Sequence, residues 1–230
     1  MLSRILELWR GKSLIGQMLD EFVEMLSLSK SMFDVVTSAG LNGGDLEAIR
    51  EDFFAKDVAI NRLEQSIRRK IVVHLSVQQS TDVPACLVLI SVAKDAERLG
   101  DYAKNIFDVL EHSPRLGTGL YYDLLVKLSA EISATFTNVG DVFRNSDVQA
   151  ARELQEASYR SAKQCDAAVH ELLGGAACEG AVAYVLLFRF YKRILAHLGN
   201  IVSSVVMPVD KIDYFDPGSR GPGQAAASSD

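Results

Sequence analysis

The chain has 230 residues, of which 48% are hydrophobic and 23% are charged, close to the average for a globular protein. This composition excludes a largely disordered chain, because disordered segments combine low hydrophobicity with high net charge. The formal net charge of −6 provides no overall positive field for phosphodiester backbones, so we expect no nucleic-acid partner.

The apolar segments of the sequence do not indicate export or membrane insertion. Glu7, Arg10 and Lys12 interrupt the N-terminal stretch that could otherwise resemble a signal peptide. The longest apolar runs, 83–93 and 180–188, are shorter than the ~20 residues that a transmembrane helix requires. The three cysteines show no C-x-x-C spacing, which fits a reducing compartment. We therefore expect a cytoplasmic protein that reaches a membrane only through partner proteins.

Polar or glycine-rich breaks divide the sequence into six long stretches, each with the apolar period of an α-helix. The breaks fall at residues 40–44, 79–82, 113–119, 145–147 and 174–180. No stretch shows a sustained alternation of apolar and polar residues, so we predict an all-α fold without a β-sheet. The apolar face of the third stretch comprises Leu89, Val92, Ala96, Leu99, Ala103, Ile106 and Leu110.

Several residues at the breaks are typical of helix starts. Asp45, Asp82 and Asp147 stand where a side-chain oxygen can cap the helix that follows. Pro84 suits the first turn of the third helix, where its missing N–H is not needed.

The six predicted helices form two sets of three, and the last helices of the sets align without a gap at an offset of about 95 residues. We therefore predict two tandem antiparallel three-helix bundles, the first repeat at 1–112 and the second at 119–207. The aligned pairs are Lys94 with Arg189, Arg98 with Arg193, Asn105 with Asn200, and Ile106 with Ile201.

A C-terminal extension follows the second repeat at residues 208–230. We expect its first part to pack on the bundle through Ile212, Tyr214 and Phe215. From about residue 216 the extension is rich in glycine, serine and alanine and has little to bury, so we expect it to be flexible.

A polar stripe runs beside the apolar face of the third helix. Glu97 and Asp101 lie one turn apart in it, and two carboxylates with this spacing can share a hard divalent cation, which prefers oxygen ligands. On the second helix, Asp57, Asn61 and Glu64 flank the apolar face in the same way. The alternative interpretation is a solvated face, on which these acids pair with neighbouring lysines and arginines.

The sequence A-K-D-A-E-R-L-G-D-Y-A-K-N-I at residues 93–106 resembles the signature helix of the PhoU family, whose pattern is roughly [DN]-x-E-R-[IL]-G-D-[HY]-A-x-N-I. Residues 57–68 are similar to that family's second-helix pattern, and the duplicated layout extends over most of the chain. The resemblance implies a non-enzymatic regulator of phosphate uptake and phosphate-responsive signalling. Its expected partners are a phosphate transporter component, a phosphate-sensing histidine kinase or both, and we expect it to be a homodimer.

The resemblance also implies metal binding, because such motifs bind iron or other divalent metals in this family. The expected ligands in the first repeat are Asp57, Asn61, Glu97 and Asp101. We expect iron or another divalent metal ion there, and no other cofactor.

The second repeat departs from this pattern. At the positions aligned with the two carboxylates of the polar stripe it has Lys192 and Ala196, and on the preceding helix Asp166 has Ala162 one turn before it. We therefore expect no metal in the second repeat. We interpret Lys192 and Arg193 as a solvated face, with an acidic partner as the alternative.

Other chemistries lack the residues that they need. A di-iron carboxylate enzyme uses Glu-x-x-His pairs, and no glutamate here has a histidine three residues later. The sequence contains no Gly-x-x-x-x-Gly-Lys loop to hold phosphates. The alternative function is a helical protein-interaction module on the same scaffold, with a partner unrelated to phosphate. Its motivation is the loss of carboxylates at Lys192 and Ala196.

Overall fold

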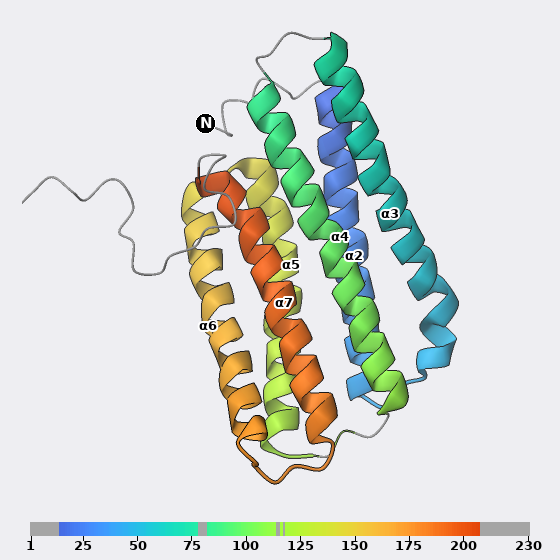
Figure 1. Ribbon diagram of the computed structural model, residues 1–230, viewed down its shortest axis with the longest axis vertical. Coiled ribbons are helices and arrows are strands. Elements are labelled where there is room, and N and C mark those ends of the chain that lie inside the picture. The colour runs from blue at the N-terminus through green and yellow to red at the C-terminus, as the bar shows by residue number, and fades with distance from the viewer. Residues whose placement is uncertain (1–13, 78–81, 114–115, 117, 208–230) are drawn as a thin grey trace, which may run out of the picture.

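The computed structural model describes residues 14–77, 82–113, 116 and 118–207, which form six long helices (Figure 1). Over these residues it contains no β-strand, which confirms the predicted all-α fold. None of these six helices is long and apolar enough to cross a membrane. In chain order the helices are α2 (Leu14–Leu41), α3 (Leu46–Val77), α4 (Val83–His112), α5 (Leu120–Asn145), α6 (Val148–Leu173) and α7 (Ala181–Val206).

The helices form two three-helix sets that lie side by side (Figure 1). In one set α2, α3 and α4 all pack on one another, and in the other α5, α6 and α7 do the same. The sets meet where α4 packs on α7 and α2 packs on α5, which leaves α3 and α6 at the two outer edges. The first set lies within the predicted repeat 1–112 and the second within 119–207.

A continuous apolar core joins the two sets. The ring of Phe33 on α2 lies 5.8 Å from that of Phe136 on α5 and 5.5 Å from that of Tyr191 on α7. Farther along the same helices, the rings of Phe22 and Phe143 are 4.6 Å apart. Every member of the predicted apolar face of α4 is buried. Buried aromatic pairs of this kind add to the stabilisation that apolar burial gives, so the sets share one core.

Two of the three predicted caps are confirmed. Asp147 accepts hydrogen bonds from the backbone N–H groups of Gln149 and Ala150, and Asp45 accepts one from Glu47. The prediction for Asp82 was wrong. Its backbone has helical angles, φ −99° and ψ 0°, instead of the extended geometry of a cap, and its carboxylate lies 2.9 Å from His74 Nε2 on α3. Asp82 therefore ties the end of α3 to the start of α4.

The predicted C-terminal extension at 208–230, with its contacts through Ile212, Tyr214 and Phe215, lies outside the described residues. The start of the first repeat, before Leu14, also lies outside them. The repeat boundaries therefore remain predictions at both ends of the chain.

Candidate functional site between α3 and α4

The predicted site residues Asp57 and Asp101 are brought together by a lysine. Lys104 Nζ on α4 lies 2.9 Å from Asp57 Oδ1 on α3 and 2.9 Å from Asp101 Oδ1 on its own helix. The helices can approach closely here because residue 100 is a glycine. A Cβ atom at Gly100 would lie 3.1 Å from Ile60 Cδ1 on α3. Glycine removes that obstacle, and the polar stripe of α4 faces the acidic side of α3 at short range.

The other predicted ligands lie near this contact but have different partners. Glu97 pairs with Lys94 at 2.7 Å, and Arg98 pairs with Asp101 at 3.0 Å. On α3, Asn61 is half-buried one turn from Asp57. The structure therefore brings Asp57 and Asp101 to one cation and turns Glu97 toward another.

The charged groups in this contact stabilise one another's ionised forms. Partial burial alone would raise the pKa of Asp101, but hydrogen bonds and attraction from Lys104 and Arg98 outweigh it, so this pKa is lowered. Burial alone would likewise lower the pKa of Lys104, but its two aspartate partners raise it. Each group therefore keeps its charge over a wider pH range than it would in water.

The fit of this site to a divalent metal is limited by Lys104. The carboxylates are suitable ligands for a hard cation, but the ammonium group of Lys104 holds the position between Asp57 and Asp101 that such an ion would take. Across the described part of the chain, no three or more His, Cys, Asp or Glu side chains gather as a metal site. A metal would have to displace Lys104, and a cavity of about 400 Å³ beside Asp101 and Lys104 provides room for the displaced side chain.

The corresponding surface between α6 and α7 also has a lysine, which the sequence analysis misjudged. Lys192 Nζ lies 2.7 Å from both carboxylate oxygens of Asp166 and its side chain is 35% exposed, whereas Arg193 is exposed. The prediction of a solvated face therefore holds for Arg193, whereas Lys192 is partly exposed and makes an ion pair between helices that was not predicted. Asp166, which lacked a predicted partner, is neutralised by this lysine.

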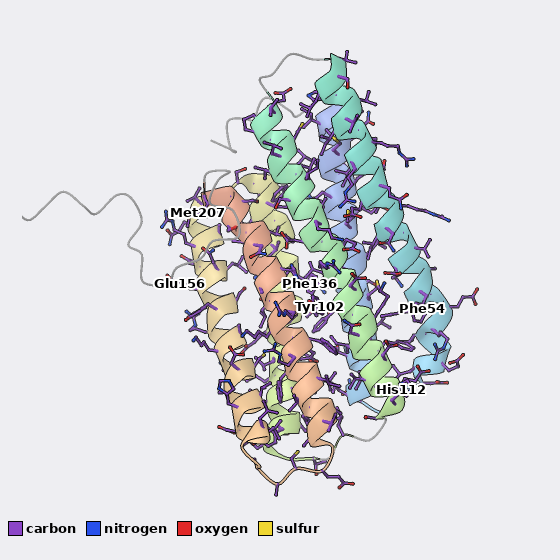
Figure 2. The ribbon with its side chains drawn as sticks, in the orientation of Figure 1. Phe54, Tyr102, His112, Phe136, Glu156 and Met207 are labelled. Atoms are coloured by element: carbon purple, nitrogen blue, oxygen red, sulfur yellow. The ribbon has the colours of Figure 1, made fainter. Side chains whose placement is uncertain are left out.

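A buried polar contact that sequence reasoning missed joins the two sets. Asp95 on α4 is 7% exposed, and its Oδ1 lies 2.6 Å from His197 Nδ1 and 3.2 Å from Asn200 Nδ2 on α7. Tyr102 stacks on the His197 ring at 5.6 Å and lies at the junction of α4 and α7 (Figure 2). The signal in the sequence is the position of Asp95, which directly precedes Ala96 and lies one turn before Leu99, two members of the apolar face of α4.

The cysteines do not provide a reactive nucleophile at this site. Cys86 and Cys165 are buried in the core, and burial raises the pKa of the Cys165 thiol to about 12. A thiol with such a pKa stays protonated near neutral pH and reacts poorly, because the thiolate is the nucleophile.

Comparisons with known proteins agree with this arrangement. The family model described as "PhoU domain" matches residues 22–110, which cover most of α2 and nearly all of α3 and α4. The fold is similar to a crystal structure of PhoU from Pseudomonas aeruginosa, with a TM-score of 0.72 and 17% sequence identity over 84% of this chain and 95% of that one. It is also similar to the phosphate transport system regulatory protein PhoU from Streptococcus pneumoniae, with a TM-score of 0.68, 17% identity and the same coverage of the two chains. A comparison with curated protein sequences finds no match. The chain therefore carries a PhoU domain at residues 22–110 and shares the fold of the PhoU family along most of its length.

Proposed function

We propose that this protein is a non-enzymatic, cytoplasmic regulator of phosphate uptake and phosphate-responsive signalling. The observation that carries the proposal is the PhoU domain at residues 22–110, in a chain whose six helices have the fold of two PhoU structures. One of those structures is described as a phosphate transport system regulatory protein.

A regulator of this kind acts by contact with other proteins, and we propose two partners. One is a component of a phosphate transporter and the other is a phosphate-sensing histidine kinase. We also propose that the regulator is a homodimer. A rigid scaffold supports this role, since the two sets share one core and the inter-set contact of Asp95 with His197 and Asn200 holds them in register.

The test is a deletion in the source organism, complemented with the tagged full-length chain. We expect the deletion to change phosphate uptake and the expression of phosphate-responsive genes, and the tagged chain to co-purify with a transporter or kinase component from native membranes. Unchanged uptake together with capture of neither component would overturn the proposal. A specific partner without any phosphate phenotype would favour the alternative, a helical interaction module unrelated to phosphate. The second helix set supports that alternative, because it has the Lys192–Asp166 ion pair in place of a set of metal ligands.

We further propose that iron or another divalent metal can replace Lys104 between Asp57 and Asp101, with Glu97 and Asn61 completing the ligands. The charge supports this, since two carboxylates share the Lys104 ammonium group, and Arg98 pairs with Asp101 alone. Removing Lys104 should then strengthen metal binding, because Asp57 would lose this lysine and Asp101 would keep Arg98, so an added cation would gain the attraction of both carboxylates.

The test compares metal content by mass spectrometry and manganese binding by calorimetry. We expect Lys104→Met to bind the ion about tenfold more tightly than wild type, and Glu97→Ala combined with Asp101→Ala to lose it. Lys192→Met is the matched control, because it frees a single carboxylate and should gain no metal. Equal metal content in wild type and the double variant would refute the site.

A further inference from the structure

A slot between α6 and α7 offers a second candidate site, away from Asp57 and Asp101. Its volume is about 320 Å³, at the lower end of the range for small-molecule pockets. Small residues line it, among them Ala162 on α6 and Ala196 and Gly199 on α7, and they leave room for a ligand beside the helix contact. A Cβ atom added at Gly199 would meet no atom within 4 Å.

The slot contains a polar group that the protein leaves without a partner. Ser158 lines it and is 4% exposed, and its Oγ has no hydrogen-bond partner among the described residues. A buried hydroxyl without a partner is unfavourable, because it has lost its hydrogen bonds to water and gained none in return. Gln155, on the same side of α6 and 6% exposed, also lines this end of the slot. A ligand that accepts a hydrogen bond from Ser158 would remove this cost.

The charges at the slot favour an anion. Lys192 and Asp166 both line it and neutralise one another at 2.7 Å. Lys163 also lines it, and its ammonium group lies 5.3 Å from the centre of the Tyr159 ring instead of beside a carboxylate within the described structure. The lining therefore carries one uncompensated positive charge, next to an aromatic ring and an apolar floor that includes Leu195.

We propose that this slot binds a small organic monoanion, a compact apolar body that carries a carboxylate or sulfonate group. The anionic group meets Lys163, the apolar body lies over Ala162, Ala196 and Gly199, and Ser158 donates its hydroxyl hydrogen to the ligand. A small hydrated inorganic ion fits less well, because the floor offers it no polar partner. The site is independent of the metal proposal and of the phosphate function, and it would give the second helix set a ligand-dependent role.

The test uses the full-length chain and the fluorescent sulfonate 8-anilinonaphthalene-1-sulfonate as the probe. We expect one probe molecule per chain by calorimetry and a matching rise in fluorescence. Gly199→Leu should weaken binding by at least about tenfold, because its side chain fills the slot. Gly140→Leu is the matched control, because Gly140 is also helical with open space around its Cβ position and does not line the slot. Both variants should fold, since leucine favours a helix more than glycine does.

A charge variant distinguishes an anion site from a merely apolar one. Lys163→Gln should weaken the sulfonate probe by about three- to fivefold and leave the neutral analogue N-phenyl-1-naphthylamine unchanged. Equal binding to wild type and Gly199→Leu, or no binding to the full chain, would overturn the proposal. Binding that arises only when the chain is cut after Met207 would also overturn it, by assigning the slot to the chain's own C-terminal residues.

Discussion

The two outer helix pairs, α3 with α4 and α6 with α7, neutralise their partly buried aspartates in different ways. In the first pair a lysine serves two carboxylates, Asp57 and Asp101, whereas in the second Lys192 serves Asp166 alone. Removing the lysine from the first pair leaves a pair of oxygen donors that another cation can use. Removing it from the second leaves one carboxylate. On the proposed function, we therefore expect a metal ion to replace Lys104 in the first contact and not Lys192 in the second.

The two pairs also differ in the space beside one glycine of each. At Gly100 an added Cβ atom would lie 3.1 Å from Ile60 Cδ1 on α3. At Gly199 an added Cβ atom would meet nothing within 4 Å, although α6 and α7 pack extensively on one another. The proposed metal site therefore lies beside a filled glycine position in the first set, and the proposed small-molecule slot lies beside an open one in the second.

The largest expected effect comes from breaking the contact that joins the two sets. Asp95→Ala removes the carboxylate that accepts hydrogen bonds from His197 and Asn200. Both donors then lose this acceptor at a mostly buried junction. We expect the free energy of unfolding to fall by about 2–3 kcal/mol, measured by urea denaturation.

The control is Asp108→Ala, an exposed position on the same helix, which should cost less than about 0.5 kcal/mol. If the two variants lose equal stability, the buried contact does not hold the sets together. Two separate transitions in Asp95→Ala would show that the sets can unfold independently.

The sequence predicts the helices and their buried faces well, because both depend on the order of neighbouring residues along the chain. Every apolar residue predicted on the face of α4 is buried, and the breaks fall where the helices end. It predicts contacts between side chains poorly, because they depend on the distance and rotation between helices. The Lys104 bridge needs α3 and α4 to meet at Gly100, and a single sequence does not give that separation.

The candidate site shows the same limit. Asp57 and Asp101 were predicted to bind one divalent metal together with Asn61 and Glu97, and that stays a prediction. In the structure these two aspartates share the chain's own Lys104, three residues from Asp101. The Lys192–Asp166 pair was missed because the residues lie on different helices with no local spacing to link them. Residue types were therefore predictable, and pairings across helices were not.

The second prediction compares the stability lost when each of the two lysines, Lys104 and Lys192, is replaced. Lys104→Met leaves Asp57 without its lysine and Asp101 with Arg98, and we expect a loss of about 1–1.5 kcal/mol in metal-free buffer, since solvent screens this partly exposed contact. Lys192→Met leaves one carboxylate and should cost less. Chelator-treated proteins unfolded in urea give both values. Equal losses would mean that the two contacts do not differ in the way proposed.

A substitution that should stabilise the ligand-free chain also tests the proposed slot. Ser158→Ala removes a buried hydroxyl that has no partner among the described residues and introduces a stronger helix former, so the ligand-free chain should gain about 1 kcal/mol. The same change should weaken the sulfonate probe. Ser161→Ala is the control on the same helix, since Ser161 donates a hydrogen bond to Glu131 at 2.7 Å and its loss should destabilise. A Ser158→Ala chain that is less stable than wild type would contradict the assignment of an unsatisfied hydroxyl.

The smallest effect concerns pH and the α3–α4 contact. The pKa of Asp101 is lowered in the folded chain from its ordinary value of 3.8, so its stabilising contribution is fully present above that value. It is lost as the pH falls below 3.8 and through the lowered folded pKa, because the folded state then has to take up a proton that breaks the contacts with Lys104 and Arg98. We expect Asp101→Asn to remove this part of the acid sensitivity, a difference of less than about 1 kcal/mol because the side chain is partly exposed and screened. Urea midpoints at pH 7 and pH 3 measure it. The stability gap between wild type and Asp101→Asn should be larger at pH 7 than at pH 3, and a gap that widens in acid would show that Asp101 is not held ionised by its neighbours.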